Sequence, residues 1–130
     1  GELRSVDPGA VLLREGSDTD RFGVLLRGLL ALRVAIAGRG TQTLLTVEPG
    51  DVYGWSALVP PYRATSTVVA LEPSELVVFE ATQLRQLLAD DDNVAAGLYP
   101  RLLQSMTRRL NATRTQLLDL YARDREYEPW

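Results

Sequence analysis

The sequence predicts an α+β fold in which antiparallel strands come first and helices follow. From Pro8 to Phe79 the chain consists of short apolar runs separated by turn residues, which is typical of an antiparallel sheet. Beyond Ala81 the apolar residues recur at helical spacing, and the last part of the chain repeats steps of three and four residues. These observations place the sheet before the helices.

Length and composition indicate one compact domain. A chain of 130 residues, 45% of them hydrophobic, buries roughly two-thirds of its unfolded surface, and no linker-like run divides it. We therefore expect a single domain over 1–130, with the sheet at about 8–80, the helices at about 82–124 and a tail at 125–130.

The clearest strand lies in the middle of the sheet region. Apolar side chains at every second position from Leu30 to Ile36 give the period of two that turns one face of a strand toward a core. The glycines of 37–40 allow a tight reversal, after which 41–47 returns as the partner strand. We expect a β-hairpin here.

Two further strands and a short helix follow. A turn at 48–51 precedes an irregular segment, and the apolar runs at 65–70 and 75–79 complete the sheet. Helical spacing then begins after Thr82, the predicted N-cap, and three aspartates at 90–92 end this helix.

A second, long helix carries an apolar seam. Its residues are spaced alternately three and four apart, as in a two-stranded coiled coil. The seam consists of Ala96, Tyr99, Leu103, Met106, Leu110, Thr113, Leu117 and Leu120. We expect it to form a homodimer, and the alternative is that it packs on the chain's own sheet. A separate stripe through Leu102 and Leu118 is suited to internal packing and leaves the seam free.

Pro100 lies inside this pattern. Because proline lacks an N–H and its ring obstructs the preceding turn, the helix is expected either to begin at Pro100 or to kink there.

Composition excludes several functions. The net charge of −3 and the pI near 4.9 argue against nucleic acid as a partner. Without His, Cys or Lys, a candidate nucleophile such as Ser56 has nothing to activate it, so no catalytic residue is expected. No apolar stretch is long enough to span a membrane, and a cytoplasmic location is the expectation. The aspartates at 90–92 lack the ligand spacing of a calcium loop, so no metal site is expected.

Three segments of the strand region carry a recognisable pattern: PGAVLLREG at 8–16, PGDVYG at 49–54, and Arg63-Ala64-Thr65. In this order they resemble the opening of cyclic-nucleotide-binding domains, the approach to their phosphate-binding cassette and the arginine-centred end of that cassette. The residues 106–113 resemble the dimerisation helix of the catabolite activator branch of bacterial regulators. The resemblance implies a β-roll, an antiparallel double-stranded β-helix of jelly-roll type, followed by a short helix and the long dimerisation helix.

The resemblance also implies a ligand, cyclic AMP or cyclic GMP. Its phosphate would lie on backbone N–H groups of a short helix and be neutralised by an arginine. The residues implied as the site are Gly54, Trp55, Ser56, Ala57, Arg63, Ala64, Thr65 and Thr113. Trp55 stands where the family places the glutamate that holds the ribose. Losing a charge-assisted hydrogen bond of about 1.5–3 kcal/mol weakens binding about 10- to 150-fold.

Three of these residues have two interpretations each. Trp55 either fills an unused pocket, which its apolar volume favours, or offers a flat surface to another ligand. Arg63 is either an anion ligand or an ordinary surface residue, because the cassette is shorter than usual before it. Thr113 either contacts a base or sets the register of the seam, and the second is favoured. The pair Arg108-Arg109 is expected to lie on an outward face.

We therefore expect a non-enzymatic regulatory domain, dimeric through its last helix, with lost or altered affinity for cyclic nucleotides. A different small anion or a protein is the remaining candidate partner. The alternative is a scaffold module that needs no ligand and is excised from, or inserted in, a larger protein. No helix-turn-helix segment is present in the sequence to bind DNA.

Overall fold

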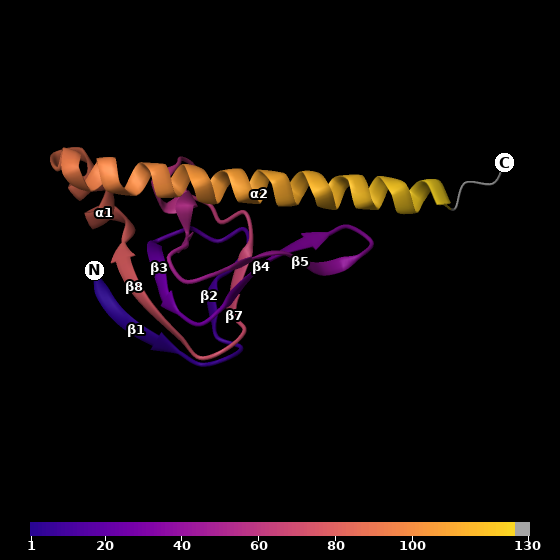
Figure 1. Ribbon diagram of the computed structural model, residues 1–130, viewed down its shortest axis with the longest axis horizontal. Helices are drawn as coiled ribbons and strands as arrows, with labels where there is room; N and C mark the ends of the chain where they lie inside the picture. Colours follow the sequence, from indigo (N-terminus) through magenta and orange to yellow (C-terminus); the bar gives the residue numbers. More distant parts are fainter. Residues whose placement is uncertain (127–130) are drawn as a thin grey trace.

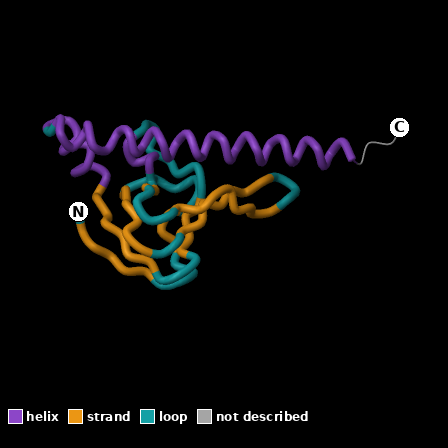
Figure 2. Tube along the Cα trace, viewed as in Figure 1, coloured by secondary structure: helices purple, strands orange, loops and turns teal. Residues whose placement is uncertain are grey.

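The structure is a computed structural model that describes residues 1–126. Two sheets of four antiparallel strands form a β-roll, and two helices lie along one side of it (Figure 1, Figure 2). The predicted α+β fold is confirmed. The strands are β1 Glu2–Val6, β2 Val11–Leu13, β3 Arg21–Arg27, β4 Leu30–Ile36, β5 Gly40–Val47, β6 Val52–Tyr53, β7 Thr67–Ala70 and β8 Ser74–Glu80. The strand orders are β1-β8-β3-β6 and β2-β7-β4-β5.

The predicted hairpin is the pair β4 and β5, which projects from the roll beside the long helix (Figure 1). Leu30 and Leu32 are buried, as the period of two predicts, but Ala31 is buried as well. Ala31 lies between Val69 on β7 and Thr46 on β5, and these cross-strand neighbours cover its small side chain.

The sheet begins earlier than the sequence predicted. β1, at Glu2–Val6, pairs with β8 at the edge of its sheet, whereas the strands were expected from about residue 8. Its side chains are mostly exposed, so this edge strand lacks the apolar runs that marked the others. The strand expected at 65–70 begins at Thr67, because 65 and 66 face the long helix.

Helix α1 spans Ala81–Asp90 and ends at the aspartates, as predicted. Its N-cap is Glu80, not Thr82. The Glu80 carboxylate accepts hydrogen bonds from the backbone N–H groups of Thr82 and Gln83, at 3.1 and 2.9 Å. The sequence rule favoured a short polar cap, but the strand leads straight into the helix and puts Glu80 in the capping place.

The cap predicts a pH-dependent stability difference. The hydrogen bonds from Gln83 and Thr82 hold the pKa of Glu80 below its ordinary value of 4.5. A carboxyl with a lowered folded-state pKa stabilises the fold above its unfolded pKa and loses this contribution as the pH falls through the folded pKa. We therefore expect Glu80→Gln to melt below the wild type at pH 7, and the difference to fade below the ordinary glutamate range. Thermal unfolding by circular dichroism measures it, and an equal difference at every pH would contradict the cap.

Helix α2 spans Asp92–Glu126 and passes through Pro100 without a break in its assignment. The prediction that the helix begins at Pro100 is wrong. Asp91 provides the start, since its carboxylate accepts from the N–H groups of Asn93 and Val94 at 3.0 and 3.2 Å. A capped first turn therefore precedes the proline by several residues.

Two apolar clusters hold the molecule together. One fills the β-roll and includes Leu25, Leu30 and Leu76. The other joins the roll to the helices and includes Phe22 and Leu102, which is 6% exposed and attaches α2. The second predicted stripe therefore packs at Leu102 but not at Leu118, which is exposed. Farther along α2, Gln116 and Leu120 face the β4–β5 hairpin instead.

Candidate functional site

The cassette is the segment between β6 and β7, and it begins at a glycine for a steric reason. Gly54 has φ of 78°, and a Cβ at this position would lie 2.5 Å from the backbone oxygen of Arg21. Only glycine tolerates both conditions without strain. It leads into a short 3₁₀ helix, η1, at Trp55–Leu58, where the resemblance implied a short helix.

The side chains of η1 point in different directions. Ser56 is buried, and its hydroxyl is hydrogen-bonded to that of Thr19 at 2.6 Å. Ala57 is fully buried in the cluster that joins roll and helices. Trp55 is half-buried and packs at the border of the same cluster. Ser56 is thus tied to Thr19 inside the fold.

A cavity lies between the cassette and α2, but it is nearly full. Its free volume is about 20 Å³, and a single water needs about 10–15 Å³ of such space. Four of the predicted site residues line it: Gly54, Trp55, Ser56 and Thr65. Ser66 on the same loop and Arg108 and Arg109 of α2 line it as well. The space that the family resemblance implies for a cyclic nucleotide therefore has almost no free volume in this structure.

Arg109 closes the cavity. Its guanidinium donates to the Ser66 hydroxyl at 3.0 Å and to the Thr65 backbone oxygen at 3.1 Å. It also lies 5.7 Å from the centroid of the Trp55 ring, within the range of a cation–π contact. Burial lowers the pKa of Arg109, and the charge of Glu15 opposes this shift. A cation of the chain itself therefore occupies the cassette.

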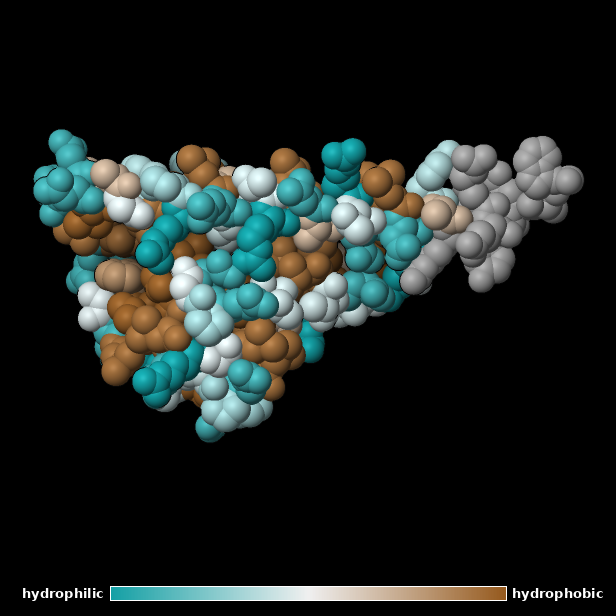
Figure 3. Space-filling view, in the orientation of Figure 1, coloured by the Kyte–Doolittle hydropathy of each residue, from teal (hydrophilic) through white to brown (hydrophobic). Residues whose placement is uncertain are grey.

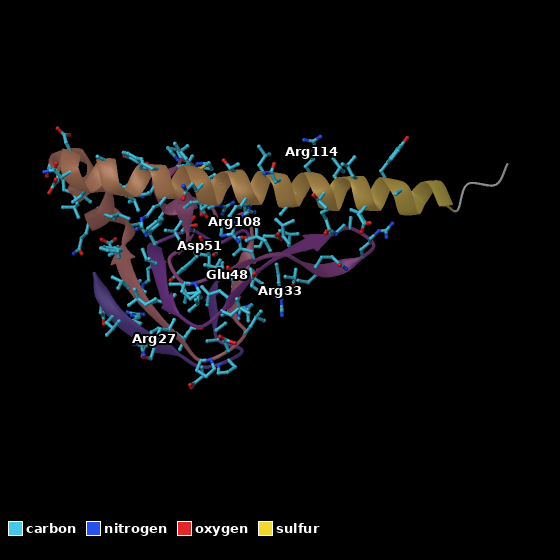
Figure 4. The ribbon with its side chains drawn as sticks, in the orientation of Figure 1. Arg27, Arg33, Glu48, Asp51, Arg108 and Arg114 are labelled. Atoms are coloured by element: carbon cyan, nitrogen blue, oxygen red, sulfur yellow. The ribbon has the colours of Figure 1, made fainter. Side chains whose placement is uncertain are left out.

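Arg108 fastens the same helix one residue earlier. It forms an ion pair with Asp51 and donates to the backbone oxygen of Thr46 at 3.2 Å. Figure 4 shows Arg108 and Asp51 facing each other between α2 and the roll. The expectation that Arg108-Arg109 lies on an outward face is wrong. Arg109 follows the buried Leu102 by two helical turns, and this spacing was the available signal for its direction.

Arg63 lies outside the cavity. Its side chain is 65% exposed, and its nearest charged partner is Asp18, at 3.8 Å. The backbones of the two residues also form an isolated β-bridge, which holds Arg63 at the surface. Ala64 is buried beside it, and Thr65 is the first residue of this run to line the cavity. The side chain of Arg63 is therefore directed away from the enclosed space.

The loop between η1 and Arg63 is held by α1. Arg85 donates to the backbone oxygen of Ala57 at 2.7 Å, and its guanidinium lies 4.3 Å from the centroid of the Tyr62 ring. Tyr62 adopts φ of 63°, a left-handed conformation that a bulky residue rarely takes. The contacts with Arg85 therefore fix the outer part of the cassette.

The predicted seam is divided between two surroundings. Leu103, Leu110 and Leu117 are 64–70% exposed, and Tyr99 is 46% exposed. Hydrophobic side chains are visible along the edge of α2 that faces away from the roll (Figure 3). Met106 instead packs partly against the joining cluster. Thr113 is exposed and donates its hydroxyl hydrogen to the backbone oxygen of Arg109 at 2.8 Å.

Among residues 1–122, whose side chains the structure describes, no group of three or more carboxylates could hold a metal ion. Within residues 1–126, no helix is long and apolar enough to cross a membrane.

Comparisons with known proteins identify the family of this fold. Residues 3–91 match the family described as cyclic nucleotide-binding domain. The acetyltransferase Pat of Mycolicibacterium smegmatis is 37% identical over 67 residues, which are 52% of this chain and 20% of that protein. The chain therefore corresponds to a small part of that relative.

Two solved structures superpose on most of this chain. A cyclic nucleotide-binding domain from Methylobacillus flagellatus KT superposes with a TM-score of 0.77 at 26% identity, covering 90% of this chain and 66% of that one. The N-terminal domain of a transcriptional regulator from Streptomyces coelicolor A3(2) superposes with a TM-score of 0.63 at 26% identity, covering 89% and 78%.

Proposed function

Because the chain belongs to the cyclic nucleotide-binding domain family, we propose that it is a non-enzymatic regulatory domain whose ligand pocket is closed by its own long helix. With the pocket closed, the domain does not bind cyclic AMP or cyclic GMP at micromolar concentration. It acts as a dimer through α2. The observation that carries the proposal is the guanidinium of Arg109 inside the cassette, with about 20 Å³ left free.

Three features of the cassette support the loss of nucleotide affinity. Trp55 stands in the place that the family resemblance gives to the ribose-binding glutamate. Arg63 is at the surface and paired with Asp18, so it is not available to a phosphate in the cavity. A nucleotide would also have to break the hydrogen bonds of Arg109 to Ser66 and Thr65. Each of these features lowers the affinity for a cyclic nucleotide independently of the other two.

The exposed leucines of α2 support the dimer. Leu103, Leu110 and Leu117 follow one another at intervals of seven residues on one face, and each is mostly exposed. Exposing a row of leucine side chains to water is unfavourable, and pairing with a second helix would bury them. Leu103 and Leu110 line a groove together with Arg109, so the face that would pair adjoins the face that closes the cassette.

A second candidate function is a scaffold module that needs no ligand at all. The closed cavity favours it, because the site is already filled by groups of the chain. A scaffold module differs from the regulatory domain in one respect: no small anion displaces Arg109. Titration with anions other than cyclic nucleotides distinguishes the two, because only the regulatory domain would bind one of them.

Isothermal titration with cyclic AMP and cyclic GMP tests the proposal, with thermal unfolding at millimolar ligand alongside. Ligand at about one hundred times its Kd stabilises a fold by about 2.7 kcal/mol, so binding in the micromolar range would raise Tm by several degrees. We expect no saturable heat and no shift. Saturable micromolar binding would refute the closed pocket. Arg63→Ala is the control: because the side chain of Arg63 lies outside the cavity, this variant should give the same absence of heat as the wild type.

A further inference from the structure

We infer that the cassette of this chain is a binding site for a guanidinium cation, which Arg109 of α2 occupies as an internal ligand and for which an external alkylguanidinium competes. The inference rests on the closed pocket of the proposed function and names the chemical class of its occupant. Cyclic nucleotides, the ligands after which the family is named, are anions. The charge that this cassette prefers is therefore reversed.

The groups that contact the Arg109 guanidinium suit a cation. Its two terminal nitrogens donate to the Ser66 hydroxyl at 3.0 Å and to the Thr65 backbone oxygen at 3.1 Å. The centroid of the Trp55 ring lies 5.7 Å from its central carbon, and the face of an indole ring is electron-rich. A phosphate in the same place would lie against the Thr65 oxygen and the ring face, neither of which donates a hydrogen bond. These contacts favour a guanidinium over an anion.

Glu15 adds a negative charge beside the same guanidinium. Glu15, Thr65 and Arg109 together line a groove between the β4–β5 hairpin and α2. The Glu15 carboxylate accepts from the backbone N–H of Ala35 at 3.3 Å, which holds it next to β4. Burial lowers the pKa of Arg109, and the charge of Glu15 opposes this shift, so the carboxylate favours the charged guanidinium. The same carboxylate would repel an anion.

The cations that line the cavity already have partners. Among the described residues of its lining, the cations are Arg108 and Arg109. Arg108 is paired with Asp51 and donates to the backbone oxygen of Thr46 at 3.2 Å. If Arg109 left the cassette, an entering phosphate would find no unpaired cation among these lining residues, whereas an entering guanidinium would find the acceptors that Arg109 had released.

Chemical rescue of Arg109→Ala tests the inference. The substitution removes the side chain from Cγ outward, and ethylguanidinium consists of the same heavy atoms. We expect it to bind saturably with a Kd on the order of 1 mM, as for a very small ligand that fits its site well. At about ten times that concentration, the ratio of folded to unfolded protein rises about 11-fold. Thermal unfolding measures this rise as an increase in Tm, and isothermal titration gives the Kd.

A matched ligand and a matched variant serve as controls. N-ethylurea has the shape of ethylguanidinium without its charge, so it should give no saturable increase in Tm. Arg114→Ala removes the same atoms from α2, but Arg114 is exposed and points away from the roll (Figure 4), so this variant should not respond to ethylguanidinium. The wild type should not respond at this concentration either, because Arg109 competes from the same chain at a high effective concentration.

A second pair of variants decides the matter if Arg109→Ala fails to fold. Arg109→Gln keeps a neutral side chain that can donate to the Thr65 oxygen, and Arg109→Glu places a carboxylate there. We expect Arg109→Glu to melt several degrees below Arg109→Gln, because the Thr65 oxygen and the Glu15 charge oppose an anion. Arg114→Gln and Arg114→Glu are the controls, and at this exposed position their Tm values should differ by less than about 2 °C.

Cyclic AMP separates this inference from the proposed function on which it rests. A wild type that binds cyclic AMP at micromolar concentration would overturn both. The inference alone is overturned by a folded Arg109→Ala that binds cyclic AMP in that range, or that responds no better to ethylguanidinium than to N-ethylurea. An Arg109→Glu protein as stable as Arg109→Gln overturns it as well. Rescue by ethylguanidinium, without rescue by N-ethylurea or cyclic AMP, supports it.

Discussion

Leu110→Asp is expected to abolish the proposed dimer and leave a monomer at concentrations at which the wild type is expected to pair. The side chain of Leu110 is 70% exposed, so an aspartate there costs the single chain little. In a paired helix the same carboxylate would be buried in an apolar seam without a counter-charge, at a cost of several kcal/mol. We therefore expect dimerisation to weaken at least about 100-fold. Sedimentation equilibrium or size-exclusion chromatography with light scattering measures it.

The control for this variant is Leu3→Asp. Leu3 lies on β1, away from α2, and its side chain is 65% exposed, so the same charge is introduced at similar exposure. Leu3→Asp should remain as dimeric as the wild type. A Leu110→Asp protein that stays dimeric would show that the seam is not the interface.

Leu102→Ala is expected to destabilise the fold by about 2–5 kcal/mol, whereas Leu103→Ala is expected to cost less than about 0.5 kcal/mol. The two variants remove the same atoms from adjacent positions of α2. Leu102 is buried in the cluster with Phe22, and Leu103 is 64% exposed. The difference therefore measures how tightly α2 is attached to the roll.

Both variants should be compared in the Leu110→Asp background, so that loss of the dimer does not contribute to the difference. Urea unfolding followed by circular dichroism gives the free energy of unfolding. Equal costs for Leu102→Ala and Leu103→Ala would contradict the docking of α2 on the roll.

The spacing of apolar residues and the turn residues predicted those helices and strands whose limits are set by neighbouring residues in the sequence. The period of two over Leu30–Ile36 matches β4 at both ends, and the aspartates at 90–92 do end α1. The edge strand β1 was missed because exposed, polar strands lack an apolar period. The start of α2 was misplaced because a proline is a stronger local signal than the distant Asp91 cap that overrides it.

The candidate site was less predictable because it depends on contacts distant in sequence. Periodicity indicated that Leu102 faces the roll, but not that Arg109 would meet Ser66, 43 residues earlier. The resemblance implied Arg63 as the arginine of the cassette, but Arg63 pairs with Asp18 at the surface, and the guanidinium that contacts Thr65 belongs to Arg109 of α2. Both contacts join residues far apart in the chain or depend on the path of the loop, so they appear only in the folded chain.

A crystal structure of the domain grown with excess cyclic AMP tests the central claim most directly. The account predicts that the guanidinium of Arg109 still bridges the Thr65 oxygen and the Ser66 hydroxyl, with no nucleotide between the cassette and α2. A nucleotide in that space, with Arg109 displaced from both partners, would contradict it.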